Sequence, residues 1–276
     1  MGPGLDISEL RSLLPELVLY DEPEDEQIAE RIAGAEIVLG NKVLISESLF
    51  AGAPDMRFIG LTATGTDNID LEAARRHGVA VANIRAYCTG SVAEHVFGCL
   101  LNLTHSLQGY VADVRGGAWQ AASNFCMLTR PINELSAMTL GIVGYGELGK
   151  GVARIGEAFG MSVIVSARPG SDTVSEGRVP FEELLTRADA ISLHCPLTED
   201  TRHLIDRREL ESMKPGAIII NTSRGAVIDN AALAIALKQG NGNMVLHYRK
   251  DRERVFSTTG TCPTCGIGFK SLDPTH

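Results

Sequence analysis

The sequence predicts an α/β protein built around parallel β-sheets, and three observations support that prediction. Short apolar runs alternate with segments of helical periodicity along most of the chain. Between residues 138 and 240 the runs are almost continuously apolar, as strands covered on both faces require. A G-x-G-x-x-G turn follows the first of these runs, Thr139–Val143. Together they predict a doubly wound sheet with ligand sites beyond the carboxyl ends of its strands.

Length and composition indicate a globular protein of one or two domains. The chain has 276 residues, 44% of them hydrophobic, and a net charge of −9. It has no Lys/Arg run that would bind phosphates, so we expect no nucleic-acid partner. No apolar run is as long as a membrane span, the N-terminus does not resemble a signal peptide, and the six cysteines show no disulfide framework. We therefore expect a cytoplasmic protein with reduced thiols and no membrane contact.

Residues 1–90 predict a small α/β unit. The expected strands are Leu17–Tyr20, Ile37–Leu39, Phe58–Leu61 and Val79–Ala82, and the expected helices are Ile7–Leu14, Glu24–Ile32 and Leu71–His77. The unit begins with a helical segment and has no strand before it, so we expect its first strand to be missing.

A single long helix is expected over residues 91–115. It opens on a capping box formed by Ser91 and Glu94, and apolar residues then recur at three- and four-residue steps until Gly116. Its length and apolar face suit a connector between two domains or a contact in a homodimer. A plain core helix is the alternative.

Residues 91–240 predict the doubly wound nucleotide-binding domain. Its expected strands are the four apolar runs Thr139–Val143, Ser162–Ser166, Ala190–His194 and Ala217–Thr222. A loop that could contact a ligand follows each run, and the carboxyl ends of parallel strands meet at one edge of a sheet. Four loops at one edge indicate a ligand site more strongly than any one of them does.

Gly144, Gly146 and Gly149 form the most informative motif. They lie between a strand and a helix, where backbone N–H groups and a helix N-terminus can face a pair of phosphates. Gly144 allows the tight turn, Gly146 lets the pyrophosphate approach, and Gly149 lets the helix pack closely on the strand. A second strand follows, which favours dinucleotide binding. A purely structural turn is the alternative.

Six stretches together resemble the D-isomer-specific 2-hydroxyacid dehydrogenases, closest to the glycerate dehydrogenase/hydroxypyruvate reductase branch. They are Ala63–Asp70, Tyr87–His95, the Gly144 loop, His194–Thr198, Met213–Gly216 and Asn221–Gly225. The resemblance covers roughly residues 5–240. It implies a Rossmann-type domain with a smaller flavodoxin-like α/β substrate domain, and we expect both to be incomplete.

The resemblance also implies a reaction, namely hydride transfer between NAD(P)H and a small D-2-hydroxy acid or 2-oxo acid of the glycerate/hydroxypyruvate type. Backbone amides near Thr64 and Gly65 would hold the substrate carboxylate. Arg224 would fork to the carboxylate and the carbonyl oxygen, although an arginine there can also cap a helix or pair with a surface acid. A histidine held by a glutamate would supply the proton.

Cofactor contacts are implied at positions that match the family's motifs. They are Thr64, Gly144, Gly146, Glu147, Leu148, Gly149, Arg168, Cys195, Pro196, Thr222, Ser223 and Arg224. After the second strand, Ala167–Arg168 stands where an acid would bind the adenosine ribose, so NADP is expected at least as much as NAD. Alternatively, Arg168 stacks on adenine with either cofactor. We interpret His194 as structural or cofactor-lining rather than as the proton donor.

The tail, residues 241–276, departs from the family, which carries its catalytic glutamate and histidine there. Glu253 and His276 follow Arg224 at spacings near those of the family pair, but outside the expected motifs. We therefore expect the true pair to be absent and the catalyst to be weak or inactive. We assign Glu253 and His276 no catalytic role.

Two further interpretations of the tail stay open. Cys262–Cys265, with His247 and His276, is half of a zinc knuckle at unusual spacing, so we expect no bound metal. The favoured hypothesis is an out-of-frame translation, because Met244–His247 and Thr261–Cys265 can encode family segments in another frame. The alternative to an active enzyme is thus a truncated or frameshifted dinucleotide-binding remnant.

Overall fold

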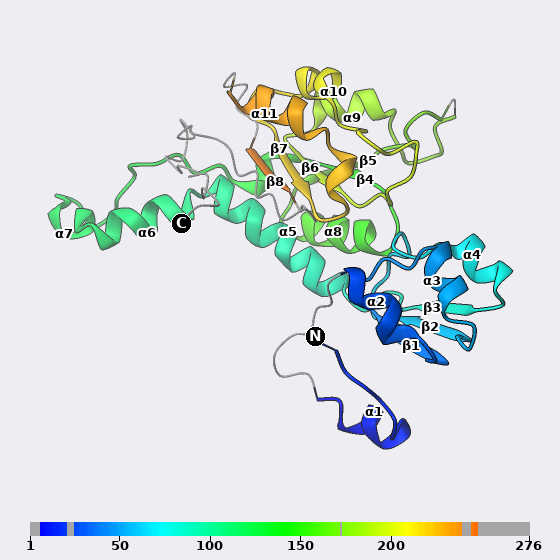
Figure 1. Ribbon diagram of the computed structural model, residues 1–276. Coiled ribbons are helices and arrows are strands. Elements are labelled where there is room, and N and C mark those ends of the chain that lie inside the picture. The colour runs from blue at the N-terminus through cyan, green and yellow to red at the C-terminus, as the bar shows by residue number, and fades with distance from the viewer. Residues whose placement is uncertain (1–5, 21–24, 172, 239–243, 248–276) are drawn as a thin grey trace. The chain divides into compact units, whose positions relative to one another are not determined.

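A computed structural model describes residues 6–20, 25–171, 173–238 and 244–247 (Figure 1). The chain divides into two compact units, Met1–Arg85 and Ala86–His276. Each unit contains one sheet, and every strand pair in both sheets is parallel. The expected α/β class with parallel sheets is therefore confirmed.

The N-terminal unit is a three-stranded sheet with short helices. Its elements are α1 (Ser8–Leu13), α2 (Asp25–Ile32), β1 (Ile37–Gly40), α3 (Glu47–Gly52), β2 (Phe58–Leu61), α4 (Leu71–Arg76) and β3 (Ala80–Asn83). The strand order is β1-β2-β3. Its core is built around the fully buried Phe50 and Ile59, against which Ile28 and Ile32 of α2 pack. Helix α4 begins at Asp70, whose carboxylate accepts a hydrogen bond from the Ala73 amide at 2.9 Å.

One expected strand of this unit is wrong. Leu17–Tyr20 forms no strand, and Val18, Leu19 and Tyr20 are exposed. An apolar run becomes a strand only where a neighbouring strand supplies the ladder hydrogen bonds, and no described strand pairs with this run. The other three expected strands are present, each within one residue of its expected bounds.

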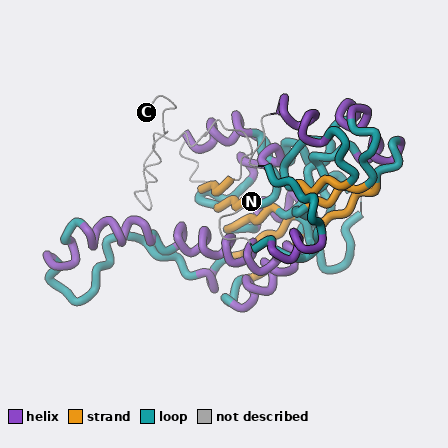
Figure 2. The backbone as a smooth tube through the Cα atoms, turned by 60° about the horizontal axis from the view of Figure 1, so that its bottom comes forward, coloured by secondary structure: helices purple, strands orange, loops and turns teal. Residues whose placement is uncertain are grey.

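The C-terminal unit carries the larger sheet. Its elements are α5 (Thr89–Thr104), α6 (Leu107–Arg115), α7 (Ala118–Ala121), η1 (Leu135–Ala137), β4 (Thr139–Val143), α8 (Glu147–Ala158), β5 (Ser162–Val165), α9 (Phe181–Arg187), β6 (Ala190–Leu193), α10 (Arg207–Ser212), β7 (Ile218–Asn221), η2 (Gly225–Val227), α11 (Asn230–Lys238) and β8 (Met244–His247). The strand order is β5-β4-β6-β7-β8 (Figures 1 and 2). The chain runs from β4 to β5 on one side and then to β6 on the other. The topological switch point, where such sheets bind ligands, therefore lies between β4 and β6.

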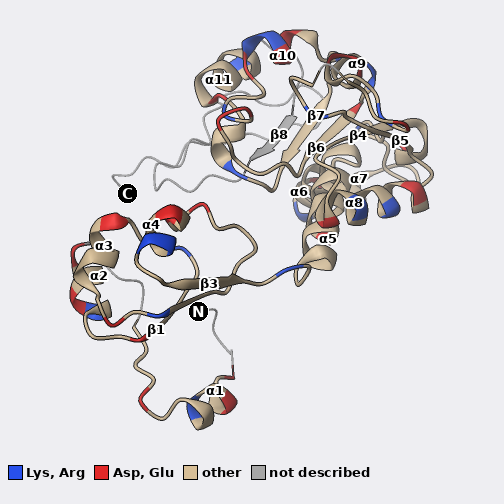
Figure 3. Ribbon diagram, turned by 90° about the vertical axis from the view of Figure 1, so that its right-hand side faces the viewer, with Lys and Arg blue, Asp and Glu red and all other residues tan. Residues whose placement is uncertain are grey.

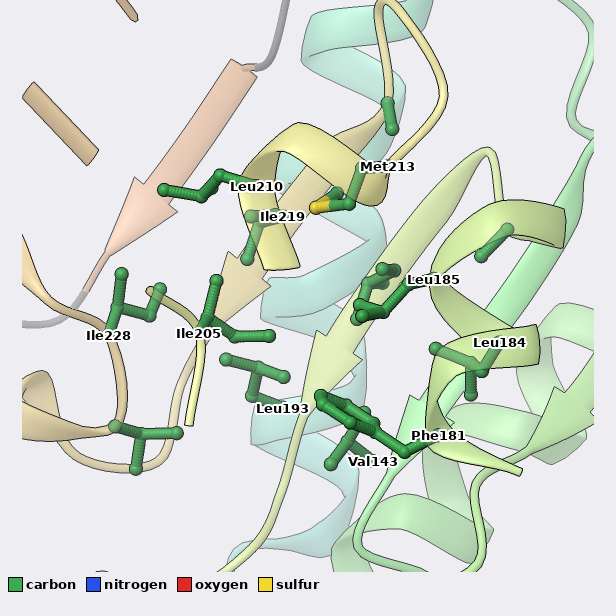
Figure 4. Close-up of a cluster of buried hydrophobic side chains, with 14 of the residues drawn as sticks. Val143, Phe181, Leu184, Leu185, Leu193, Ile205, Leu210, Met213, Ile219 and Ile228 are labelled. Carbon is green, nitrogen blue, oxygen red and sulfur yellow. The ribbon is translucent and has the colours of Figure 1, made fainter. Parts of the chain in front are cut away.

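Successive residues of the central strands enter different cores. Ile218 and Ile220 of β7 pack with α5 and α8, whereas Ile219 between them packs with α9, α10 and α11. Figure 4 shows the second of these cores, with Leu184, Leu193 and Ile219 gathered between helices and sheet. The strands β4, β6 and β7 carry no charged residue (Figure 3). Burial on both faces explains the continuous apolar runs and confirms the doubly wound sheet.

The expected single helix over residues 91–115 is wrong, because the structure has two helices there. Helix α5 begins at Thr89, with Cys88 at the N-cap and no side-chain cap, so the expected capping box is also absent. The helical run is interrupted at Ser106, which adopts a left-handed conformation with φ of +52°. The Ser106 hydroxyl donates a hydrogen bond to the Pro131 carbonyl oxygen at 3.0 Å. Periodicity cannot reveal this break, because the segment that stabilises it returns from more than twenty residues away.

The sheet also continues beyond the expected domain boundary at residue 240. Strand β8, Met244–His247, pairs in parallel with β7, and Ile218 is opposite Met244. The first residues of the expected tail therefore belong to the sheet. None of the helices within the described ranges has the length and apolar character needed to cross a bilayer.

Candidate functional site

The register of the larger sheet aligns the ends of three strands. Val143 of β4 is opposite Leu193 of β6, and Leu193 is opposite Asn221 of β7. The loops that follow these residues therefore leave the sheet at the same edge. They contain the glycine turn, His194–Pro196 and the turn that carries Arg224.

The glycine turn has the geometry expected of a phosphate-binding loop. Gly144 has φ of +94°, and a Cβ there would lie 2.6 Å from the Cys195 nitrogen and the His194 carbonyl carbon. A Cβ on Gly149 would overlap the carbonyl oxygen of Gly144, whereas a Cβ on Gly146 would meet open space. The turn thus packs directly on the backbone that follows β6, at the switch point.

The N-terminus of α8 adds donors to this turn. Gly146 is the N-cap residue without a side-chain cap, and Glu147 and Leu148 are the first residues of α8. N–H groups in a first helical turn have no acceptor within the helix, and the helix dipole favours an anion beside them. These positions fit a pyrophosphate.

The residues that follow β6 have uncharged side chains at the carboxyl ends of the strands. His194 shares a hydrogen bond between its Nε2 and the Ser192 hydroxyl at 2.8 Å, and burial lowers the pKa of its imidazole to about 4. Burial also raises the pKa of the Cys195 thiol to about 11. Both side chains are therefore neutral near neutral pH. A general acid needs a pKa near the working pH, so these values support the interpretation of His194 as a lining residue.

A buried amide shapes the turn that carries Arg224. The Asn221 side chain donates to the Arg224 carbonyl oxygen at 2.9 Å and accepts from the Ser223 amide at 3.0 Å and the Ser223 hydroxyl at 2.8 Å. Arg224 is half-buried, and its Nη1 donates to the Ser223 carbonyl oxygen at 3.1 Å. The turn therefore holds a guanidinium at the edge of the sheet without placing it on the open surface.

Two buried polar atoms at this edge fit a bound dinucleotide. Within the described residues, neither His194 Nδ1 nor Thr222 Oγ1 has a hydrogen-bond partner. Buried polar atoms are normally paired, so such atoms beside a glycine turn are consistent with a polar ligand. Together with the open space at Gly146, the residues present fit a dinucleotide.

The surroundings of Arg168 require a correction. The sequence places no acid beside it, but Asp200, from the loop after β6, lies 3.2 Å from the Arg168 guanidinium. Both side chains are exposed, that of Arg168 to 78%. A carboxylate therefore does lie beside Arg168, and it comes from a residue that is distant along the chain.

Arg178 is a neighbour of this region that the sequence analysis missed. Its Nη1 donates to the Ser166 carbonyl oxygen at 3.2 Å, at the end of β5, and its guanidinium lies 5.8 Å from the centre of the Tyr145 ring in the glycine turn. No motif marks Arg178, because it lies outside the six stretches that carry the resemblance to the family.

Other predicted residues lie elsewhere. Thr64 and Gly65 belong to the N-terminal unit, in the loop after β2, where Asn83 donates to the Thr64 carbonyl oxygen at 2.7 Å. Glu253, Cys262, Cys265 and His276 lie outside the described residues. His247 lies in β8, opposite Asn221. In the described part of the chain, no cluster of three His, Cys, Asp or Glu residues could hold a metal ion.

Comparison with known proteins agrees with this geometry. The family model of the NAD binding domain of D-isomer specific 2-hydroxyacid dehydrogenases matches residues 97–246, so the resemblance does not stop at residue 240 as expected. Glycerate dehydrogenase from Methylorubrum extorquens is 43% identical over 215 residues, covering 78% of this chain and 67% of that protein.

Solved structures agree as well. D-lactate dehydrogenase from Aquifex aeolicus, complexed with NAD and lactic acid, aligns with a TM-score of 0.74 at 30% identity, over 91% of this chain and 76% of that one. An acyclic imino acid reductase in complex with NADPH and D-Arg aligns with a TM-score of 0.75 at 28% identity, over 91% and 82%. The chain therefore belongs to the D-isomer specific 2-hydroxyacid dehydrogenase family of NAD-binding oxidoreductases.

Proposed function

We propose that the chain transfers a hydride between NAD(P)H and a small D-2-hydroxy acid or 2-oxo acid, with glycerate and hydroxypyruvate as the substrate pair. The observation that carries the proposal is the contact of the Gly144 turn with the His194–Cys195 backbone, at the sheet edge where Arg224 also emerges. The 43% identity to a glycerate dehydrogenase supports this substrate pair.

Arg224 is the proposed substrate anchor. The nicotinamide, when bound, supplies or accepts the hydride. A guanidinium is planar and always charged, so Arg224 can bind the substrate carboxylate and polarise the carbonyl oxygen at the same time. The Asn221 hydrogen bonds fix the backbone of the turn that carries Arg224 before the substrate arrives, which lowers the cost of orienting its side chain.

Backbone amides near Thr64 and Gly65 are proposed ligands of a substrate carboxylate. Neutral His194 and Cys195, with Pro196, line the cofactor beside Thr222 and Ser223. The carbonyl oxygen needs a proton from a group that titrates near neutral pH, and the pKa of His194, about 4, makes it unsuitable. The family resemblance assigns this role to a glutamate–histidine pair, but residues 241–276 lack its motifs, so no residue of this chain is assigned to the proton transfer and we expect slow turnover.

NADP is the proposed preference between the two cofactors. Ala167–Arg168 offers a guanidinium in place of the acid that binds the ribose hydroxyls of NAD. The neighbouring Asp200 weakens the contribution of Arg168. The ratio of kcat/KM for NADPH to that for NADH tests the preference, and a strong preference for NADH contradicts it.

A second copy of this chain is the proposed partner, and it binds the segment around α6 and α7. This segment extends away from the larger sheet (Figures 1 and 2) and exposes the apolar side chains Val111, Val114, Trp119, Phe125 and Leu128. Phe125 is 92% exposed and Leu128 is 80% exposed, which is unusual for a surface that stays in water. Light scattering should give a dimer, and the double variant Phe125→Asp/Leu128→Asp should give a monomer. A monomeric parent contradicts the proposal.

The main experiment combines turnover and binding. NADPH and NADH oxidation is followed with hydroxypyruvate, and the rise in Tm with each cofactor is measured in parallel. Arg224→Gln should lower kcat/KM by about a hundredfold or more, because it removes a donor to the reacting oxygen. Arg187→Gln, whose guanidinium pairs with Glu183 on the surface of α9, is the control and should change little.

The outcomes separate the candidate functions. Turnover that depends on Arg224 supports the dehydrogenase. A rise in Tm with cofactor but no turnover supports the dinucleotide-binding remnant. If neither turnover nor a rise in Tm is observed, both candidates fail. The coding DNA tests the frameshift hypothesis separately, since codons that cannot encode the family segments in another frame exclude it.

A further inference from the structure

We infer that Arg178 is the residue that selects the cofactor, by binding the 2′-phosphate of NADP(H). The inference rests on the proposed dinucleotide function and adds a residue that no family motif covers. It differs from the assignment of this role to Arg168 alone, which the position of Arg168 after β5 suggests.

The backbone places Arg178 beside the end of β5. The Ala167 amide donates to the Val179 carbonyl oxygen at 2.7 Å, and the Val179 amide donates to the Val165 carbonyl oxygen at 2.9 Å. The guanidinium itself donates to the Ser166 carbonyl oxygen at 3.2 Å. Arg178 is therefore held next to Ala167–Arg168, although nine residues lie between it and Arg168 along the chain.

The same guanidinium reaches the glycine turn. It lies 5.8 Å from the centre of the ring of Tyr145, the residue between Gly144 and Gly146. In a doubly wound sheet, the pyrophosphate lies at the glycine turn and the adenosine ribose lies at the end of the next strand. Arg178 contacts both elements, so it stands between the two places where the phosphates and the ribose of a dinucleotide bind.

The charges around the two arginines favour Arg178 over Arg168. The Arg168 guanidinium pairs with Asp200, and a phosphate that approached it would also meet that carboxylate. Arg178 is half-buried, and its contacts in the described part of the chain are a carbonyl oxygen and an aromatic ring, both uncharged. Glu176 is the nearest described acid in sequence and is exposed. A fixed guanidinium with further N–H donors is well suited to a phosphate group.

Two nucleotides test the inference by binding alone. Adenosine 2′,5′-bisphosphate carries the 2′-phosphate and adenosine 5′-monophosphate lacks it, and calorimetry on the full chain gives the affinity for each. We expect Arg178→Gln to lower the affinity for the bisphosphate about tenfold or more and to leave that for the monophosphate within about twofold, since one charged hydrogen-bonded pair is lost. Arg168→Gln should lower the bisphosphate affinity less, and Arg187→Gln should change neither.

Each remaining outcome supports or overturns the inference. If the parent binds both nucleotides and Arg178→Gln keeps the parent's preference, Arg178 does not read the 2′-phosphate. If the parent binds neither nucleotide, the proposed function itself fails. Should Arg178→Gln fail to fold, Arg178→Lys tests the inference instead, because lysine keeps the positive charge but lacks the planar, paired N–H donors of the guanidinium. The inference then predicts unchanged monophosphate affinity with an intermediate bisphosphate affinity, and equal changes for both nucleotides overturn it.

Discussion

The two parallel sheets of this chain differ in how completely they are buried. In the larger sheet, every residue of β6 and β7 is buried, whereas β1 and β3 of the smaller sheet have no buried residue. Helices pack on both faces of the larger sheet, so its central strands are held from two sides. The glycine turn and Arg224 therefore lie on the more deeply buried of the two sheets. The loop with Thr64 and Gly65 leaves a sheet that we expect to open more easily.

The largest expected effect comes from Gly149→Ala. Its Cβ would overlap the Gly144 carbonyl oxygen, which belongs to backbone and cannot swing aside. We expect a loss of about 4 kcal/mol or more in the free energy of unfolding, together with loss of dinucleotide binding. Urea unfolding and the rise in Tm with cofactor are the measurements. Gly98→Ala on α5 is the matched control, because open space surrounds that position and the change should stabilise the helix by up to about 1 kcal/mol. Equal effects of the two substitutions contradict the close packing of turn and helix.

The next effect compares the cores of the two sheets. Ile219 of β7 is fully buried, whereas Ile37 of β1 is 47% exposed. Ile219→Ala should therefore cost about 3 kcal/mol, within the range for a large-to-small change in a core, and Ile37→Ala should cost less than about 1 kcal/mol. Urea unfolding gives both values. Similar costs at the two positions would show that the smaller sheet is as tightly packed as the larger one.

A smaller effect depends on pH. Burial lowers the pKa of His194 from 6.5 to about 4, so between these values the unfolded chain binds a proton that the folded chain does not. Stability should thus fall as the pH drops from 6.5 towards 4, by up to about 3 kcal/mol from this residue.

The measurement compares the parent with His194→Gln, which does not titrate but can still bond to Ser192. The difference in unfolding free energy between about pH 7 and about pH 5 should be smaller in the variant. NMR titration of the His194 ring gives the pKa directly. A ring that titrates near 6.5 removes the physical basis of this prediction.

The smallest expected effect concerns thiol reactivity and leaves stability unchanged. Cys195 is buried and its pKa is raised to about 11, whereas Cys126 in the segment after α7 is exposed. Iodoacetamide should therefore modify Cys126 before Cys195, because the reactive form is the thiolate. Mass spectrometry of the peptides gives the order, and unfolding in urea should abolish the difference. Rapid modification of Cys195 in the folded chain would mean that the edge beyond β6 is open to solvent.

Much of the larger sheet could be predicted from sequence. Its strands β4, β5, β6 and β7 lie within one residue of the expected bounds at each end, because burial on both faces leaves continuous apolar runs. The positive φ at Gly144 and the close packing at Gly149 also agree with the tight turn and the close helix contact expected there. The conformation of exposed and half-buried segments is harder to predict from sequence. Leu17–Tyr20 has the composition of a strand, but no described strand pairs with it. Across Ser106, apolar residues keep their helical spacing although the helix is interrupted there.

The features of the candidate site likewise fall into two groups, those that local sequence predicts and those that depend on tertiary contacts. The α/β class, the glycine turn and the polar loops after the strands can all be predicted from local sequence, because each depends on neighbouring residues and on apolar patterning. The pairing of Arg168 with Asp200, and the position of Arg178 beside Tyr145 and Ser166, become visible in the folded chain alone. Such pairs depend on the strand order and register, which bring together residues that the chain itself keeps far apart.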